Sequence, residues 1–260
     1  MSDFRVVWLR RYLRSEPRVV FDVGSYDAGD SIRIKEAYPA SEVYAFEASP
    51  RNYKERVAPR AARFRVRHFN LALCEKNGTA IFHDSFGASE ASGSILAPTT
   101  TMSLQHPDVQ FNAPVSVPAT TIEQFCEEHS IGLIDFLHMD VQGAEGLVLS
   151  GMGRIKARMI FLEACESEKY QGASSREQLS EVLKQKGYTL VRRLPFDDLY
   201  LENTEYQAYV ASPLRGQLYD AVDTVQNAAL FVYRPLVRLM TSSGLTRNRT
   251  LRRIMGRHVS

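Results

Sequence analysis

Acidic side chains stand near the ends of three apolar segments, where a parallel sheet would bind a ligand. Asp22, Glu47 and Asp140 each lie within or directly after such a segment. If the segments are parallel strands, their carboxyl ends meet at one edge of the sheet, beside a ligand crevice. Carboxylates at that edge repel a dinucleotide pyrophosphate, which prefers a bare glycine loop at a helix N-terminus. They suit a ligand that carries a sulfonium and an ammonium group.

The loop after the first segment reads Gly24-Ser-Tyr-Asp-Ala-Gly29. A glycine lets the backbone approach a ligand closely, and Asp22 and Asp27 flank this one. The alternative is a tight strand–helix turn with solvated acids. Glu47 follows at about 20 residues, where an acid accepts hydrogen bonds from the hydroxyls of an adenosyl ribose. An exposed glutamate at a strand end is the alternative for Glu47.

A third motif, Phe136-Leu-His-Met-Asp-Val-Gln-Gly-Ala-Glu145, surrounds Asp140. Because side chains alternate along a strand, His138 and Asp140 share one face, and Asp140 lies at the carboxyl end. His138 is the candidate base, since a neutral imidazole can take a proton near pH 7. A histidine satisfied within a buried strand is the alternative.

The elements that would position these residues alternate between strands and helices. This order predicts an α/β protein with a right-handed, doubly wound, mostly parallel sheet. Strands are expected at 18–24, 42–47, 64–69, 134–139, 158–163 and 188–193, and helices at 30–38, 52–57, 121–129, 143–149 and 175–187.

An antiparallel part completes the expected sheet. The Asn77-Gly78 turn signal predicts that residues 71–74 pair with 79–83, and residues 197–201 and 207–211 are expected to form an antiparallel edge. Residues 84–118 show little periodicity, which predicts a long functional loop over the active site. Ser92 and Ser94 in this loop are candidate acceptor contacts, and a plain flexible loop is the alternative.

Together these motifs resemble the FkbM family of methyltransferases. The family pattern runs roughly Asp-x-Gly-Ala-Asn-x-Gly, then Phe-Glu-Pro, then Lys-x-Asp-x-Glu-Gly-x-Glu. The corresponding elements here begin at Asp22, Phe46 and His138, and segments that begin at Asn70 and Thr121 also match in order. The resemblance covers about residues 18–210. It implies a Rossmann-like class I methyltransferase domain over 18–212 and S-adenosylmethionine (SAM) as the cofactor. The expected acceptor is a hydroxyl of a sugar, glycan, glycolipid or secondary metabolite.

The resemblance also implies roles for individual residues. Asp22 and Gly24 would line the methionine part of SAM, and Leu71 and Ala72 would border the adenine. The full set of expected cofactor-binding residues is Asp22, Gly24, Ser25, Asp27, Glu47, Ala48, Leu71, Ala72, Asp140 and Gln142. The expected catalytic residues are His138, Asp140 and Glu163.

The sequence departs from the family pattern on the acceptor side. The usual lysine is His138, the usual glutamate is Gln142, and the usual asparagine after the first glycine is displaced by Ser25-Tyr26. Cofactor binding should survive these changes, whereas substrate choice and deprotonation depend on them. Asp140 and Glu163 could together hold a divalent cation that orients two acceptor oxygens, and the alternative is a site without metal.

The bulk composition excludes several other classes of protein. A formal net charge of +2 over 260 residues is too small to indicate nucleic-acid binding. Cys74, Cys126 and Cys165 show no CxxC spacing, so neither disulfides nor zinc are expected and a cytoplasmic location is predicted. Residues 1–17 are expected to form a short helix without the features of a secretory signal, and no membrane-spanning segment is expected.

Residues 213–260 are expected to form a helical extension. Its residues from 224 onward carry arginine as the only charged side chain, after an apolar stretch in which Pro235 should produce a kink. Such a helix can pack on its own domain or on a second subunit of a homodimer. It can also lie peripherally at the inner membrane surface.

Two other functions fit a sheet of this kind. An NAD-type oxidoreductase is disfavoured because the first loop is acidic and lacks a third closely spaced glycine. A non-catalytic adenosyl-ligand-binding or scaffold protein would keep the fold, and the departures at His138 and Gln142 leave that alternative open.

Overall fold

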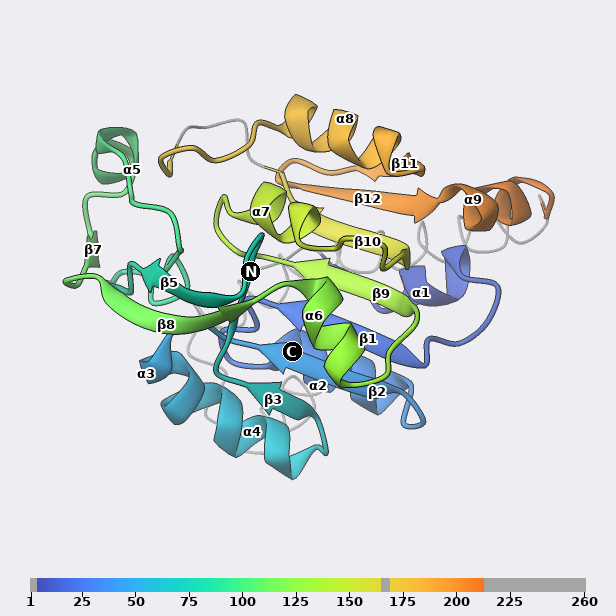
Figure 1. Cartoon of the computed structure of the whole chain (residues 1–260), viewed down its shortest axis with the longest axis horizontal. Helices are drawn as coiled ribbons and strands as arrows, with labels where there is room; N and C mark the ends of the chain where they lie inside the picture. Colours follow the sequence, from blue (N-terminus) through green and yellow to red (C-terminus); the bar gives the residue numbers. More distant parts are fainter. Residues whose placement is uncertain (1–3, 165–168, 213–260) are drawn as a thin grey trace, which may run out of the picture. The chain divides into compact units, whose positions relative to one another are not determined.

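A computed structural model describes residues 4–164 and 169–212. A seven-stranded sheet forms its centre (Figure 1). The strands of this sheet are β1 (Val19–Val23), β2 (Glu42–Phe46), β3 (Arg67–Phe69), β9 (Ile134–Met139), β10 (Ala157–Glu163), β11 (Tyr188–Arg193) and β12 (Asp197–Glu202). Their spatial order is β11-β12-β10-β9-β1-β2-β3.

Most neighbouring strands of this sheet run parallel. The pairs β1–β2, β1–β9, β9–β10 and β2–β3 are parallel, whereas β12 is antiparallel to both β10 and β11. The predicted mostly parallel, doubly wound sheet with an antiparallel part is therefore confirmed. The antiparallel strand is β12, one position in from the edge. The chain leaves β1 toward β2 and returns on the other side at β9, so the crevice of the fold opens between the carboxyl ends of β1 and β9.

Hydrophobic cores lie on both faces of the sheet, because successive side chains of a buried strand point to opposite faces. Leu137 packs in one core and its neighbour Phe136 in the other. The first core is covered by α6 (Ile122–Glu128), α7 (Glu145–Ser150) and α8 (Arg176–Gln185), and the second by α1 (Val7–Tyr12), α2 (Gly29–Ala37), α4 (Ala58–Arg63) and α9 (Asn203–Val210).

A composite helix follows β2. It begins as α3 (Pro50–Asn52), continues through a π-helical turn, η1 (Tyr53–Val57), and ends as α4. Ser49 caps it: its Oγ accepts a hydrogen bond from the Asn52 amide at 3.1 Å, and Pro50 occupies the first turn. Serine at the N-cap and proline directly after it are the residues that favour a helix start.

A smaller sheet corrects one sequence prediction. Its strands are β4 (Ala72–Leu73), β5 (Gly78–Phe82) and β8 (Val115–Thr120), and β8 lies between the other two. The predicted pairing of 71–74 with 79–83 is therefore wrong, because β8 pairs with both segments. The segment 84–118 also contains β6 (Ser85–Gly87), α5 (Thr100–Gln105) and β7 (Val109–Phe111). Its Ser- and Pro-rich composition hid these short elements.

A second correction concerns the end of the domain. Residues 207–211 do not form the predicted edge strand, because they belong mostly to α9. The Glu202 side chain accepts a hydrogen bond from the Thr204 amide at 2.8 Å and so caps this helix. This local capping favours a helix at the place where an edge strand was predicted.

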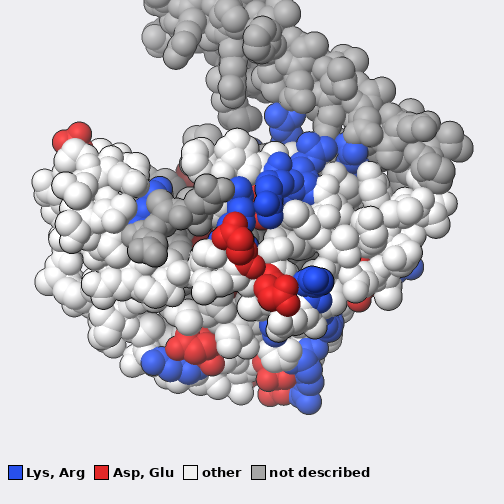
Figure 2. All heavy atoms as spheres, turned by 90° about the horizontal axis from the view of Figure 1, so that it is seen from above, with Lys and Arg blue, Asp and Glu red and all other residues white. Residues whose placement is uncertain are grey.

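Charges of both signs lie close together on the face seen from the side of α8. There, basic and acidic side chains gather in a band, and smaller charged groups lie elsewhere on the same face (Figure 2). Within residues 4–164 and 169–212, no helix is long and apolar enough to cross a membrane. The predicted extension 213–260, with its proposed dimer or membrane contact, and Cys165 lie outside the described residues.

Candidate active site

A pocket of about 540 Å³, including the part open to solvent, lies at the carboxyl ends of β1, β2 and β9. The walls combine loops that are far apart in the sequence: Val23, Gly24 and Tyr26; Phe46, Glu47, Ala48 and Asn52; Leu71, Ala72 and Leu73; Phe82, Glu90, Ala91, Gly93, Ser94 and Ile95; and Asp140, Val141 and Ala144.

Gly24 allows two of these walls to touch. Its φ is +82°, and a Cβ built on it would lie 2.0 Å from the Asp140 carbonyl oxygen. The Gly24 amide donates to the Phe46 carbonyl at 3.0 Å, so the loop is also tied to the end of β2. No other residue fits this position, because both the positive φ and the close backbone approach exclude a side chain.

Glu47 provides a buried carboxylate in the pocket wall. The side chain is 6% exposed, and its two oxygens accept hydrogen bonds from the amides of Tyr26 and Ser49, each at 2.8 Å. Burial raises the pKa of Glu47 to about 7, against the two amide bonds, which lower it; the charges of Asp84 and Asp22 raise it further. Each carboxylate oxygen keeps a lone pair for a second donor.

Gln142 joins two carboxylates at the ends of adjacent strands. Its Nε2 lies 2.7 Å from Asp140 Oδ1 and 2.8 Å from Glu163 Oε2. Tyr170 Oη lies 3.3 Å from Gln142 Oε1. Asp140 is in the pocket wall, so this bridge connects the end of β10 to the pocket.

Glu145 shapes the turn between Asp140 and α7. It is 3% exposed, and its Oε1 accepts hydrogen bonds from the amides of Val141 at 3.2 Å and Gly143 at 3.3 Å. Burial is the main reason that the pKa of Glu145 rises to about 7, and the charge of Asp140 adds to the rise. This glutamate therefore fixes the backbone that carries Asp140 and Gln142.

The family of this protein follows from a match over most of the domain. Residues 22–190 match the Methyltransferase FkbM domain. The chain belongs to the FkbM methyltransferase family. As a member of this family, it is a SAM-dependent methyltransferase, and neither the oxidoreductase nor the scaffold alternative is favoured.

Relatives of this FkbM methyltransferase include a curated bacterial enzyme. The 2-O-methyltransferase NoeI of Sinorhizobium fredii is 32% identical over 200 residues, which cover 72% of this chain and 80% of NoeI. A methyltransferase FkbM structure from Methylobacillus flagellatus is 14% identical with a TM-score of 0.43; the match covers 72% of this chain but only 44% of that one. A precorrin-6y C5,15-methyltransferase from Geobacter metallireducens is 15% identical with a TM-score of 0.40, over 75% of this chain and 86% of that one.

In this FkbM methyltransferase, six of the predicted cofactor residues lie in the pocket wall: Gly24, Glu47, Ala48, Leu71, Ala72 and Asp140. The other four are not wall residues. Ser25 donates through its Oγ to the Phe46 carbonyl at 2.9 Å, and Gln142 forms the bridge described above. Asp27 accepts from the Gly29 amide at 2.8 Å and pairs with Arg60.

Asp22 and His138 form a buried pair outside the wall of this pocket. His138 Nδ1 lies 2.8 Å from Asp22 Oδ1, and the Ser31 amide and hydroxyl donate to Asp22 Oδ2. The imidazole is 2% exposed and stacks against Phe136 and Phe161. The structure therefore does not bring His138 to the pocket as the predicted base, and the satisfied buried histidine is the arrangement it has.

Of the two predicted acceptor contacts, only Ser94 is part of the pocket wall. Ser92 lies beside it and accepts a hydrogen bond from Tyr170 Oη at its carbonyl, 2.7 Å away. The sequence analysis did not predict Tyr26, Asn52 and Glu90 as wall residues. The Ser-Pro pair after Glu47, which indicates a helix start, could have pointed to Asn52. Glu90 reaches the pocket only through tertiary contacts, which leave no local pattern. Among the described residues, no group of three or more His, Cys, Asp or Glu side chains is arranged to hold a metal ion.

Proposed function

We propose that this methyltransferase transfers the methyl group of SAM to a hydroxyl oxygen of a sugar, glycan, glycolipid or related secondary metabolite. The observation that carries the proposal is the hydrogen-bonded group formed by Asp140, Gln142 and Glu163, in which Asp140 is part of the pocket wall. Such a polar group can bind the hydroxyls of a polyol through several hydrogen bonds. The name of the relative NoeI, a 2-O-methyltransferase, supports transfer to oxygen.

The residues of the pocket fit SAM. Glu47 offers the remaining lone pairs of a buried carboxylate to ribose hydroxyls, and Leu71 and Ala72 offer apolar surface to the adenine. Gly24 lets the backbone close on the methionine part. When bound, SAM supplies a methyl group on a sulfonium, which already carries its own leaving group, so positioning dominates catalysis.

Asp140 is the residue that we place at the acceptor hydroxyl. Its carboxylate would accept a hydrogen bond from the hydroxyl and take the proton as the oxygen forms its bond to the methyl carbon. Gln142 and Glu163 would hold Asp140 in this orientation. We assign His138 a positioning role, since its pair with Asp22 supports the loop that contains Gly24.

A divalent cation between Asp140 and Glu163 is the alternative arrangement. The Gln142 Nε2 group lies between the two carboxylates and donates to both, and an amide nitrogen with its two hydrogens does not coordinate a cation. We therefore propose a site without metal, in which the Gln142 amide holds the two carboxylates together through its two hydrogen bonds. Turnover that survives chelation by EDTA would support this part of the proposal.

The test is methyl transfer from methyl-labelled SAM to a panel of saccharides, compared with the same saccharides with blocked hydroxyls. Label should appear only on acceptors with free hydroxyls. Asp140→Asn should lower turnover by roughly 100-fold or more, which is the usual contribution of a general base, while SAM still binds. Binding of SAM without transfer to any hydroxyl acceptor would reject the proposal.

A further inference from the structure

Asn52 has a buried acceptor atom in a side chain that belongs to the pocket wall. The side chain is 3% exposed and forms part of the pocket wall. Its Nδ2 donates to the Glu90 carbonyl at 2.8 Å, which settles which end of the amide is oxygen. Asn52 Oδ1 is buried and has no hydrogen-bond partner among the described residues. A buried acceptor without a donor is costly, so its presence indicates a missing partner.

The surroundings of Asn52 connect it to the ribose-binding acid. The Ser49 amide donates to Glu47 Oε1, and Ser49 Oγ accepts from the Asn52 amide. Glu47 lies just before the Ser49 cap and Asn52 lies in the first turn after it, and both belong to the pocket wall. A ligand held by Glu47 has its adenosine part on this side of the pocket.

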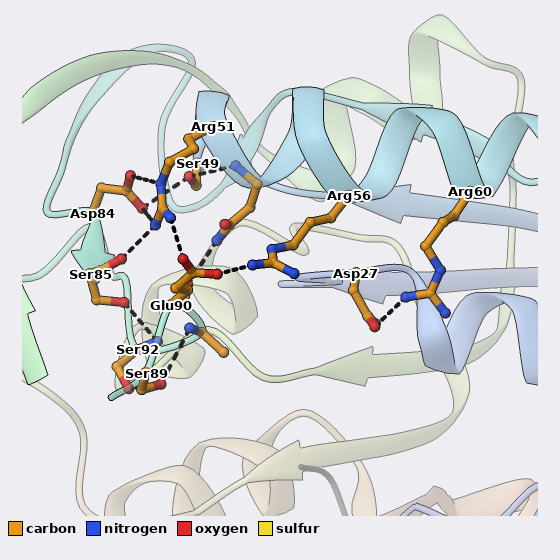
Figure 3. A network of polar contacts seen from close by, with 12 residues as sticks. Asp27, Ser49, Arg51, Arg56, Arg60, Asp84, Ser85, Ser89, Glu90 and Ser92 are labelled. Atoms are coloured by element: carbon orange, nitrogen blue, oxygen red, sulfur yellow. Dashed lines mark hydrogen bonds and ion pairs between the residues drawn. The ribbon is translucent and has the colours of Figure 1, made fainter. Parts of the chain in front are cut away.

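Two arginines of the same composite helix hold the segment that orients Asn52 (Figure 3). Arg51 Nη1 lies 3.0 Å from Glu90 Oε1 and its Nη2 lies 2.6 Å from the Ser85 carbonyl, while Arg56 pairs with Glu90 Oε2. The guanidinium of Arg56 also lies over the Tyr26 ring, 5.1 Å from its centroid. Arg56 thus links two parts of the pocket wall, the Tyr26 loop and the Glu90 segment.

The π-helical turn explains how both arginines reach one glutamate. Residues five apart do not share a face of an α-helix, where neighbours on one face are three or four apart. In η1 the hydrogen bond runs from residue i to i+5, which brings Arg56 to the side of Arg51. Such single π turns occur frequently at functional sites.

We propose that Asn52 binds the cofactor directly, its Oδ1 accepting a hydrogen bond from a donor of the adenosine moiety, and that Arg51, Arg56 and Glu90 are positioning residues that hold Asn52 and close the pocket. The donor is a ribose hydroxyl or the exocyclic amine of adenine. This rests on the binding of SAM in the pocket and is independent of the acceptor.

Binding of S-adenosylhomocysteine, measured by calorimetry without acceptor, tests the direct contact. Asn52→Ala should raise Kd about 5- to 30-fold, whereas Asn203→Ala, at the exposed start of α9, should leave it unchanged. An analogue that lacks the partner donor (2′-deoxy, 3′-deoxy or S-inosylhomocysteine) should lose affinity for the wild type but not further for Asn52→Ala. If every analogue loses the same factor in both proteins, Asn52 makes no direct contact.

The positioning role has its own readout in the dissociation rate of S-adenosylhomocysteine. Arg56→Ala and Glu90→Gln should each speed dissociation by about 3- to 10-fold. Salt should accelerate the wild type more than Glu90→Gln, which lacks the charge that pairs with both Arg51 and Arg56. Lys54→Ala removes a charge from the same π-helical turn and serves as the control. Equal dissociation rates in Arg56→Ala and wild type would overturn the positioning role of Arg56. A wild type that binds no cofactor would instead reject the proposed function.

Discussion

The His138 imidazole and the Asp22 carboxylate form a hydrogen-bonded pair, 2.8 Å from Nδ1 to Oδ1, between the parallel strands β9 and β1. The two side chains are 2% and 1% exposed. Burial alone lowers the pKa of His138, but the hydrogen bond and charge of Asp22, with the charges of Asp140 and Asp197, outweigh it and raise that pKa. The pair therefore stabilises the end of β1, directly before the Gly24 loop at the crevice.

His138→Ala should lower the free energy of unfolding by roughly 3–5 kcal/mol, because it leaves the Asp22 carboxylate buried without its partner. A raised pKa in the folded state stabilises the protein fully below the unfolded value near 6.5, and this contribution is lost as the pH rises through the folded value. Urea unfolding at pH 6 and pH 9 measures both effects. The difference between the variant and the wild type should shrink at pH 9, and a constant difference would mean that the histidine is neutral.

Gly24→Ala should unfold or inactivate the site, because its Cβ meets the Asp140 carbonyl at 2.0 Å and φ is +82°. The left-handed conformation alone costs an alanine about 1–2 kcal/mol, and the clash adds to that cost. Gly132→Ala is the control, since no atom lies within 4 Å of its Cβ. Melting temperatures of the two variants make the comparison, and similar values would show that the β1 and β9 loops separate easily.

The sequence predicted the positions that depend on local pattern. The apolar strands, the glycine after β1 and the acid at the end of β2 follow from continuous apolar runs and spacing, and Gly24 and Glu47 lie in the pocket as expected. The roles of the other acids depend on partners. Asp27 meets Arg60 of α4 and Asp22 meets His138 of β9, and these contacts come from packing of segments that no periodicity relates.

The segment 84–118 was the least predictable part, for a physical reason. β8 is stabilised by two neighbours, β4 and β5, so its own composition, which includes Pro118 opposite Thr79, carries little signal. Glu90 reaches the pocket because Arg51 and Arg56 hold it there, and ion pairs between distant segments leave no local pattern in the sequence.

Binding of SAM should weaken as the pH falls below 7. The pKa of Glu47 is about 7, and a protonated carboxyl offers fewer acceptors to the ribose hydroxyls. Calorimetric Kd values at pH 6 and pH 8 should differ in the wild type, with tighter binding at pH 8. Glu47→Gln should remove this pH dependence, and Glu47→Ala should raise Kd roughly 10- to 100-fold through the loss of hydrogen bonds to a charged acceptor. Unchanged affinity in Glu47→Ala would place the ribose elsewhere.

Gln142→Ala should slow methyl transfer without weakening the binding of SAM. The amide of Gln142 is the link between Asp140 and Glu163, and without it two like charges at adjacent strand ends repel each other and lose their common orientation. Single-turnover rates should fall about 10- to 100-fold, while Kd for SAM changes less than about twofold. Gln185→Ala removes a similar glutamine–glutamate bond from the exposed face of α8 and is the control.

Gln142→Glu separates the amide bridge from a metal site at the same position. It would place a third carboxylate beside Asp140 and Glu163, and such a cluster binds hard divalent cations. Mn²⁺ binding, followed by electron paramagnetic resonance, should therefore appear in Gln142→Glu and be absent from the wild type. If the wild type binds Mn²⁺ as well and loses turnover in EDTA, the amide does not replace a cation, and Asp140 and Glu163 act as its ligands.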